Sequence, residues 1–389
     1  MVEPTAEACD QSNLGAYGRK LHRSEADERG SPKMTEDIDE EALRLLKEIF
    51  EDRFDYRFDR RQLQAEKPNT GGLLPLASVS PVSAGEVQVL AELAGRYSVP
   101  LVALGAETVY EPGMREKGSI LVRCDLMRKV WLKGFRETWA RAQPGASWLE
   151  LDDNLHTRGW GLAVYPTSAP RATIGGWLAL GGVGVGSFEY GRLHENVLSA
   201  DVVLPGGECK TVRGEDLGNL VREKTNGGIV VAATLRTRWA NADVPFAATF
   251  REVADLVGSV AEVTETGVPL WHLAFLNPEL ARARGLGEEY LLFGAYPRVR
   301  AAKAEEGLLR VLESNRGRVI SATEAYRVWG ERFFPVSPSQ PTPSATRELV
   351  SIEKLPEKLG EASNRRTRAA VQGTVAHSRE VLLLSFGIG

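Results

Sequence analysis

The stretch from Ile174 to Gly191, IGGWLALGGVGVGSFEYG, holds seven glycines among bulky apolar residues. Glycine loses more backbone entropy on folding than alanine does, so a run this dense is poor material for a regular helix or strand. The Rossmann pattern G-x-G-x-x-G fails, because Ser187 stands where Gly182 and Gly184 call for a third glycine. Taken alone, the stretch leaves two interpretations open: a loop that lets the backbone approach a ligand, and a glycine-rich loop packed in a core.

The composition indicates an ordinary soluble globular protein. The chain has 389 residues, 43% of them hydrophobic and 26% charged, a length that favours two domains. Its net charge of −4 disfavours a broad nucleic-acid-binding face, and no apolar run is long enough to span a bilayer. Cys9, Cys124 and Cys209 show no paired spacing, which disfavours a disulfide framework and favours a reducing cytoplasm. No metal site is predicted, because paired His or Cys ligand spacings are absent.

The chain organisation predicts four consecutive parts. Residues 1–33 are polar and predict a disordered tail, and 34–75 predict a segment built on the helix TEDIDEEALRLLKEIFEDRF. Residues 76–241 predict an α+β domain, and 242–389 predict helices laid on an antiparallel sheet.

Local patterns within the third part indicate its elements. ASVSP, the amphipathic helix SAGEVQVLAELAGRYS and the buried strand VPLVALG give a parallel β-α-β unit. SADVVLPGGECKTV predicts a hairpin that turns at Pro-Gly-Gly, and GIVVAATLRTRW predicts a further strand.

The order of these elements resembles one known family. The sequence P-x-S-x-x-x-x-T-I-G-G-W from Pro166 to Trp177 is followed by Tyr190-Gly191 and then by a V-V-L-P-G-G strand. This order is similar to the PCMH-type FAD-binding domain of vanillyl-alcohol oxidase and p-cresol methylhydroxylase. Within that family it looks most like glycolate oxidase subunits, D-lactate dehydrogenases and alkyldihydroxyacetonephosphate synthase. The resemblance implies a two-subdomain FAD-binding domain followed by an α+β cap domain with an antiparallel sheet.

The same resemblance implies a non-covalently bound FAD between two loops. The residues carried over to the first loop are Leu104, Gly105, Ala106, Glu107 and Thr108. Those carried over to the second loop are Pro166, Thr167, Ser168, Thr173, Ile174, Gly175 and Gly176, with Tyr190 and Gly191 near the flavin and Ile229 at the edge of the last strand. The first loop departs from the family, which has glycines where this chain has Ala106 and Glu107. No histidine lies between residues 100 and 123, so no covalent flavin link is expected from that loop.

Three residues are candidates for catalysis. The segment YRVWGERFFPVSP resembles the W-x-x-R segment of 2-hydroxy-acid enzymes, which implies that Arg332 binds a carboxylate. His377 and His194 are the candidate histidines. His272, in the apolar strand PLWHLAFLN, would point either to the core or to the substrate pocket, and a core histidine is the more frequent case.

The function implied is oxidation of a small 2-hydroxy acid, such as D-lactate or glycolate, by hydride transfer to flavin N5. Electrons would pass to a quinone or a protein acceptor. The chain ends earlier than its family, which implies a contribution from a partner subunit, with a cytoplasmic location that is peripheral to the membrane through that partner. Two alternatives stay open: a transferase like alkyldihydroxyacetonephosphate synthase, and a non-catalytic FAD-binding subunit of a larger complex.

Overall fold

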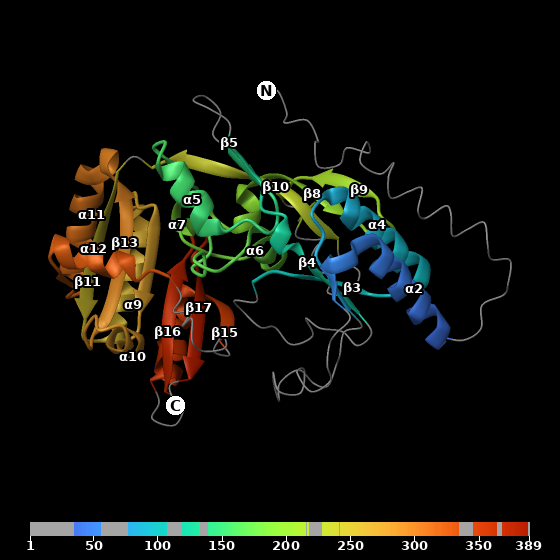
Figure 1. Cartoon of the computed structure of the whole chain (residues 1–389). Helices are drawn as coiled ribbons and strands as arrows, with labels where there is room; N and C mark the ends of the chain where they lie inside the picture. Colours follow the sequence, from blue (N-terminus) through green and yellow to red (C-terminus); the bar gives the residue numbers. More distant parts are fainter. Residues whose placement is uncertain are drawn as a thin grey trace. The chain divides into compact units, whose positions relative to one another are not determined.

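A computed structural model describes residues 35–55, 77–106, 119–132, 139–214, 216–217, 228–240, 242–333, 345–363 and 368–387, with side chains from residue 41 onward. The predicted tail 1–33, together with Glu107 and Thr108, lies outside the described residues. The described chain divides into two compact units (Figure 1). Unit 1 comprises residues 1–147, 172–180 and 197–235, and unit 2 comprises 148–171, 181–196 and 236–389. The two units interleave along the chain. The predicted domains are contiguous ranges, and their boundaries stay a prediction.

Unit 1 contains two small sheets and the helices that pack on them. Its helices are α2 (Thr35–Phe50), η2 (Glu51–Arg53), α4 (Ala84–Tyr97), η3 (Cys124–Leu126) and α6 (Ile174–Leu180). Its strands are β1 (Phe54–Asp55), β2 (Ala77–Val79), β3 (Leu101–Leu104), β4 (Ile120–Arg123), β5 (Val130–Leu132), β6 (Trp139–Ala142), β8 (Val197–Val203) and β9 (Cys209–Val212). Strand β10 (Ile229–Trp239) begins in unit 1 and ends in unit 2.

The first sheet confirms the predicted parallel β-α-β unit. Its order is β1-β2-β4-β3, and β4 pairs in parallel with both β2 and β3. Helix α4 begins where the Ser83 side chain accepts the Glu86 N–H, and its Val87, Leu90 and Leu93 are buried. Helix α2 lies beside α4 (Figure 1), and both contribute to one hydrophobic core. These periodic apolar faces give the helices their place on the sheet.

The second sheet runs in the order β5-β6-β10-β8-β9. Strands β8 and β9 form the predicted hairpin, whose turn places Gly206 and Gly207 at φ of +89° and +91°. Strand β10 confirms the predicted strand GIVVAATLRTRW. Its last residues pair with β7 (Trp160–Leu162) in unit 2.

The glycine-rich stretch corrects one expectation, because residues Ile174–Leu180 form helix α6. Gly175 and Gly176 occupy its first turn, where the N–H groups of Ile174 and Gly175 donate to Ala146 and Pro144. These contacts outside the helix offset the low helix propensity of glycine. Local composition alone therefore misjudged this segment.

Unit 2 is built around a seven-stranded antiparallel sheet in the order β14-β11-β13-β12-β16-β17-β15. The strands are β11 (Asp243–Phe250), β12 (His272–Leu276), β13 (Tyr290–Pro297), β14 (Arg318–Val319), β15 (Thr346–Ser351), β16 (Ala369–Val375) and β17 (Glu380–Gly387). The helices are α5 (Trp148–His156), α7 (Ser187–Tyr190), η4 (Leu193–Asn196), α9 (Val253–Thr266), α10 (Pro278–Ala283), η5 (Arg298–Arg300), α11 (Ala301–Ser314), α12 (Ala322–Gly330), η6 (Ile352–Lys354) and α13 (Leu355–Ala362).

The two faces of this sheet bury different helices. Helices α9, α11 and α13 cover the face that carries Leu273 and Phe275. Helices α10 and α12 cover the other face, with Ala274 and Leu276. His272 belongs to this second face, because side chains two residues apart on a strand point the same way. The predicted fold class, α+β with an antiparallel sheet in the second half, is confirmed.

Three further observations concern cysteines, membranes and metals. Cys124 is free and buried, but Cys209 is disulfide-bonded, which the cysteine spacing did not predict. Among the helices that the structure describes, none is both long and apolar enough to cross a membrane. Within the same residues, no three His, Cys, Asp or Glu side chains gather as a metal centre would require.

Candidate functional site

Two glycine-containing segments of unit 1 meet where strand β3 ends. A Cβ on Gly105 would lie 2.9 Å from Gly176 Cα and 2.9 Å from Thr173 Oγ1. A Cβ on Gly176 would lie 3.3 Å from Gly105 Cα. Only glycine fits on either side of this contact. The structure thus brings the start of the first predicted loop against the end of the second.

The backbone N–H groups at this contact are not all available. Ile174 N donates to Ala146 O at 2.9 Å, and Gly175 N donates to Pro144 O at 2.8 Å. Gly176 N donates to Thr173 Oγ1 at 3.4 Å. By contrast, no acceptor among the described residues takes the N–H of Gly105 or Ala106. Successive free N–H groups bind anions, so the residues present fit the pyrophosphate of FAD through the first loop.

The other predicted cofactor residues are distributed over both units. Pro166, Thr167 and Ser168 are buried in unit 2, in successive turns held by the bonds Ala169 N to Pro166 O and Arg171 N to Ser168 O, each 3.0 Å. The Ile229 side chain is 5% exposed and packs in the core of unit 1, so it offers a ligand only its backbone. Its expected place at the adenine or flavin edge stays a prediction.

Tyr190 and Gly191 lie in unit 2, at the end of the short helix α7. Gly191 has φ of +77°, and a Cβ there would meet the Glu195 carboxylate at 2.5 Å. Burial is the main cause of the raised pKa of half-buried Tyr190, followed by the charge of Glu189. Gly191 thus lies in a turn that has no room for a side chain. Contact of Tyr190 and Gly191 with the flavin stays a prediction.

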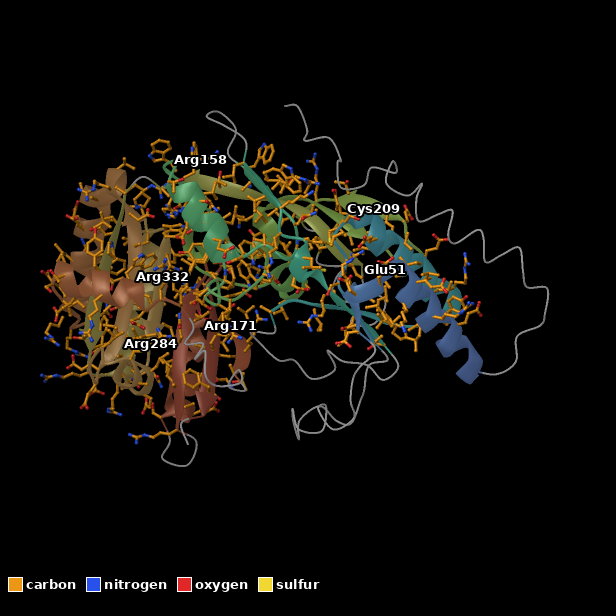
Figure 2. All side chains as sticks on the ribbon, in the orientation of Figure 1. Glu51, Arg158, Arg171, Cys209, Arg284 and Arg332 are labelled. Atoms are coloured by element: carbon orange, nitrogen blue, oxygen red, sulfur yellow. The ribbon has the colours of Figure 1, made fainter. Side chains whose placement is uncertain are left out.

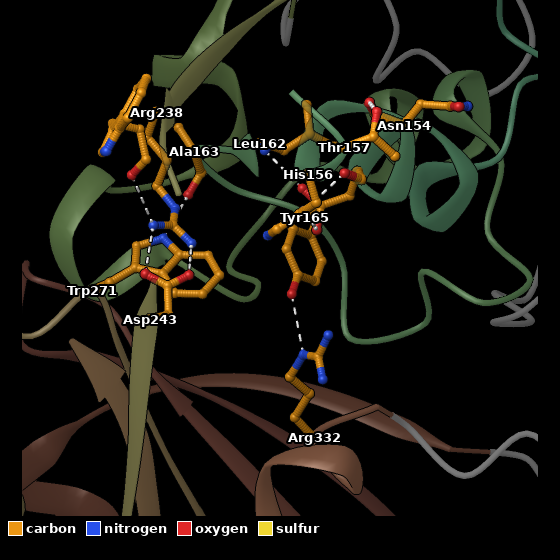
Figure 3. A network of polar contacts seen from close by, with 12 residues as sticks. Asn154, His156, Thr157, Leu162, Ala163, Tyr165, Arg238, Asp243, Trp271 and Arg332 are labelled. Atoms are coloured by element: carbon orange, nitrogen blue, oxygen red, sulfur yellow. Dashed lines mark hydrogen bonds and ion pairs between the residues drawn. The ribbon is translucent and has the colours of Figure 1, made fainter. Parts of the chain in front are cut away.

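Arg332 follows helix α12 within a group of aromatic side chains of unit 2 (Figure 2). Its guanidinium carbon lies 4.6 Å from the centre of the Trp329 ring and 4.1 Å from that of Phe333. Nε donates to Tyr165 Oη at 3.1 Å (Figure 3), and Nη1 donates to Trp329 O at 3.0 Å. Among the described residues, Nη2 finds no acceptor and no carboxylate forms an ion pair with Arg332. An arginine held this way presents a charged donor that suits a carboxylate.

Tyr165 fixes the orientation of that guanidinium. The chain reaches it from α5 and β7, where Asp152 Oδ1 accepts the Leu162 N–H at 2.7 Å. Tyr165 and Val185 exchange two backbone hydrogen bonds of 3.1 and 2.7 Å. Burial raises the pKa of the Tyr165 phenol to about 12, against the opposing charge of Arg332. The phenol is therefore neutral at pH 7, and it accepts from Arg332 while retaining its own proton.

His272 is wholly buried on the same side of the sheet. Its Nδ1 faces the N–H of Gly186 at 3.4 Å, and its Nε2 has no partner among the described residues. Burial, and then the charge of Arg332, lower the pKa of His272 to about 3, so the ring is neutral at pH 7. Its ring centre lies 5.7 Å from that of Trp329, the same ring on which Arg332 stacks. This position agrees with the core histidine expected from the apolar strand.

The two candidate catalytic histidines lie elsewhere in unit 2. His377 is exposed in the turn between β16 and β17, with its N–H donating to Ser187 O at 3.2 Å. An exposed imidazole does not fit the base of a water-excluded site. His194 lies in η4, where a Cβ on Gly181 would lie 2.6 Å from its Cε1. Its predicted place beside a flavin stays a prediction.

Sequence reasoning missed Tyr165, Arg284 and Gln372, which all contact the Arg332 segment. Tyr165 stands directly before the predicted loop at Pro166, and that adjacency was the one available signal. Arg284 and Gln372 carry no local signature, because each lies in an ordinary helix end or strand.

Comparison with known proteins agrees with this geometry. Residues 75–213 match the family described as "FAD binding domain". The chain is 28% identical over 248 residues to a mitochondrial D-lactate dehydrogenase [cytochrome] of Arabidopsis thaliana, a match that covers 60% of this chain and 42% of the relative. It is 32% identical over 144 residues to an alkyldihydroxyacetonephosphate synthase of Dictyostelium discoideum, covering 36% of this chain and 24% of the relative. The chain thus spans less than half the length of these two relatives.

A solved structure shows the fold. p-Cresol methylhydroxylase with substrate bound superposes with a TM-score of 0.69 at 12% identity, over 90% of this chain and 83% of that one. Together with the sequence match, this confirms the resemblance drawn from the glycine-rich stretch. Residues 75–213 of this chain thus match the FAD binding domain, and the chain has the fold of p-cresol methylhydroxylase, a PCMH-type flavoprotein.

Proposed function

We propose that the chain is an FAD-dependent oxidoreductase that oxidises a small 2-hydroxy acid of the D-lactate or glycolate type. The final electron acceptor is a quinone or a partner protein. The match to the FAD binding domain and the D-lactate dehydrogenase among the relatives support the class of reaction. One observation carries the substrate class: Arg332 contacts Trp329, Phe333 and Tyr165, yet no carboxylate of the described residues forms an ion pair with it, and the buried Asp152 acts on it only as a charge beyond ion-pair distance.

The chain's own residues account for holding the acid. Arg332 offers Nη2 to the substrate carboxylate, and the aromatic rings beside it restrict water and so strengthen the attraction. The neutral Tyr165 phenol accepts from Arg332 Nε and holds the guanidinium without adding charge. FAD, when bound, supplies the two-electron acceptor that such an oxidation needs. We propose that the N–H groups of Gly105 and Ala106 hold its pyrophosphate and that the binding is non-covalent.

The first test is the visible spectrum of the full chain. Flavin bands that bleach anaerobically on addition of D-lactate or glycolate would support the proposal. A protein that takes up no FAD, or whose flavin neither acid reduces, would contradict it. Arg332→Lys keeps the charge but loses the planar fork, so its KM for the acid should rise while its FAD content stays unchanged. The matched control is Arg310→Lys, an exposed arginine of α11 whose ion pair, among the described residues, is with Glu306 of its own helix.

The second test concerns the cofactor cradle. Gly105→Ala places a Cβ 2.9 Å from Gly176 Cα, so the two segments must separate and FAD should bind more weakly. Gly360→Ala in α13 is the control, because nothing lies within 4 Å of the Cβ it would add. Titration of apoprotein with FAD, followed by quenching of flavin fluorescence, measures both. Equal FAD affinity in the two variants would remove Gly105 from the proposed site.

A further inference from the structure

The turn that carries Arg332 is held by its backbone carbonyls. Arg284 Nη1 donates to Glu331 O, and Arg284 Nη2 donates to Phe333 O at 2.8 Å. Gln372 Nε2 donates to the carbonyl between them, Arg332 O, at 2.9 Å. Three successive carbonyls are thus bound by two side chains, which we call the carbonyl clamp. A backbone turn held at three consecutive points has little freedom to shift.

The two side chains of the carbonyl clamp also bind each other. Arg284 Nη2 donates to Gln372 Oε1 at 3.2 Å, so the Gln372 amide uses both its oxygen and its nitrogen. Gln372 is wholly buried on strand β16, in the centre of the sheet. The sheet, rather than the turn, therefore fixes the position of the Gln372 side chain. Through the carbonyl clamp, Gln372 in turn fixes the position of Arg332.

The short helix α10 places Arg284 beside the turn that carries Arg332. Asn277 fixes the start of this helix, where its Oδ1 accepts the N–H of Leu280 at 3.0 Å and its Nδ2 donates to Ala369 O at 2.8 Å. Arg284 caps the end of the helix, followed by Gly285 at φ of +66°. Arg327 of α12 donates to Gly285 O at 2.6 Å. Both ends of α10 are thus anchored to the elements that flank Arg332.

Arg284 carries its positive charge in a half-buried position. Among the described residues, no carboxylate forms an ion pair with it, and its Nε is buried without a partner. Burial lowers the pKa of the guanidinium to about 10, while the charge of Glu331 opposes that shift, so the group stays protonated at pH 7. Keeping a cation partly out of water without an anionic partner costs free energy.

We propose that Arg284 is a positioning residue that sets Arg332 for binding the carboxylate of the acid. The inference rests on the proposed function, in which Arg332 holds that carboxylate. Arg284 itself binds carbonyls of the turn and acts through Arg332. Small displacements of a binding group lower affinity strongly, because the geometry of a charge-assisted hydrogen bond is narrow.

The test compares two arginines at the end of α10. Arg284→Gln removes the bonds to Glu331 and Phe333, whereas Arg282→Gln removes an exposed ion pair with Glu288 and serves as the matched control. Oxalate is the probe, since it is a carboxylate that needs no turnover, and its Kd is read from the flavin spectrum of the FAD-loaded full chain. Arg284→Gln should raise this Kd, and the KM of the acid, about tenfold with kcat and FAD affinity unchanged. Arg282→Gln should change neither.

A double-mutant cycle separates this inference from the proposed function. Arg284→Gln in the Arg332→Lys background should add less than about twofold, because the two residues then act through one contact. If Arg332→Lys alone leaves the oxalate Kd unchanged, the proposed function is overturned. If Arg332→Lys raises it but Arg284→Gln does not, or the two effects multiply, the positioning role is overturned. Should Arg284→Gln fail to fold, Gln372→Met replaces it, with the same separation of Kd from FAD affinity expected.

Discussion

Two arginines of unit 2 stack on tryptophan rings, and they differ in whether a carboxylate pairs with them. Figure 3 shows Arg238 with Trp271 and Asp243, and Arg332 with Tyr165. The guanidinium of Arg238 lies 3.4 Å from the centre of the Trp271 ring and binds both oxygens of Asp243, at 2.9 and 2.5 Å. Arg332 lies on Trp329 and binds a phenol and a carbonyl instead. A neutralised, buried arginine suits a structural role, whereas a held but unneutralised one suits an anion from outside the chain.

The largest effect should come from Arg238→Met. It leaves the mostly buried Asp243 carboxylate without its partner, so the free energy of unfolding should fall by about 3–5 kcal/mol while KM for the acid stays near its wild-type value. Urea denaturation with parallel kinetics measures both. The control is Arg310→Met, which breaks a pair with Glu306 in which both side chains are exposed and should matter much less. Equal destabilisation by both variants would show that burial does not distinguish the Arg238 pair.

Arg332→Met should have the opposite profile. No buried carboxylate is left unpaired, so stability should change little. The acid loses a charged hydrogen bond of about 1.5–3 kcal/mol, which predicts a roughly 10- to 100-fold higher KM. Steady-state kinetics measures the KM of Arg332→Met, and the midpoint of urea denaturation measures its stability. A large loss of stability with unchanged KM would make Arg332 a structural residue like Arg238.

The proposed role of Arg332 also requires that the His272 ring, which lies beside Trp329, is uncharged. Its pKa is about 3 in the folded chain against roughly 6.5 in an unfolded one, so below pH 6.5 only the unfolded state takes up this proton. The free energy of unfolding should therefore fall by about 1.4 kcal/mol per pH unit between about pH 6 and 3.5, and this contribution should level off below pH 3.

His272→Gln tests that pH dependence. It should flatten this part of the stability curve, while His377→Gln, at an exposed turn, should retain it. The measurement is urea denaturation at a series of pH values. A wild-type slope in His272→Gln would mean that the ring is not held neutral.

Tyr165→Phe should have the smallest effect. It removes the oxygen that accepts from Arg332 Nε but keeps the ring contacts with Trp271 and Phe333. A net loss of about 0.5–1.5 kcal/mol predicts a KM a few-fold above wild type, with kcat less affected. Tyr326→Phe on the exposed side of α12 is the control. If Tyr165→Phe matched Arg332→Met in KM, the phenol would have to bind the substrate directly.

Local patterns predicted much of unit 1 because they report local physics. The amphipathic helix α4, the parallel strands around it and the Pro-Gly-Gly hairpin were all readable from periodicity and turn residues. Helix α6 was missed, since the contacts of Gly175 with Pro144 and of Gly176 with Gly105 are made with distant parts of the chain. These contacts decide where glycine is needed. Helix propensity gives no information about contacts between segments far apart in the sequence.

The sequence by itself determined the fold family, because the order of short motifs from Pro166 to the hairpin strand survives at low identity. It also singled out Arg332, through the spacing from Trp329. Only the tertiary structure decided what holds that arginine, since Tyr165 lies 167 residues before it and Gln372 lies 40 residues after it. Hydrogen bonds depend on distance and direction in space, and a linear pattern records neither for residues so far apart.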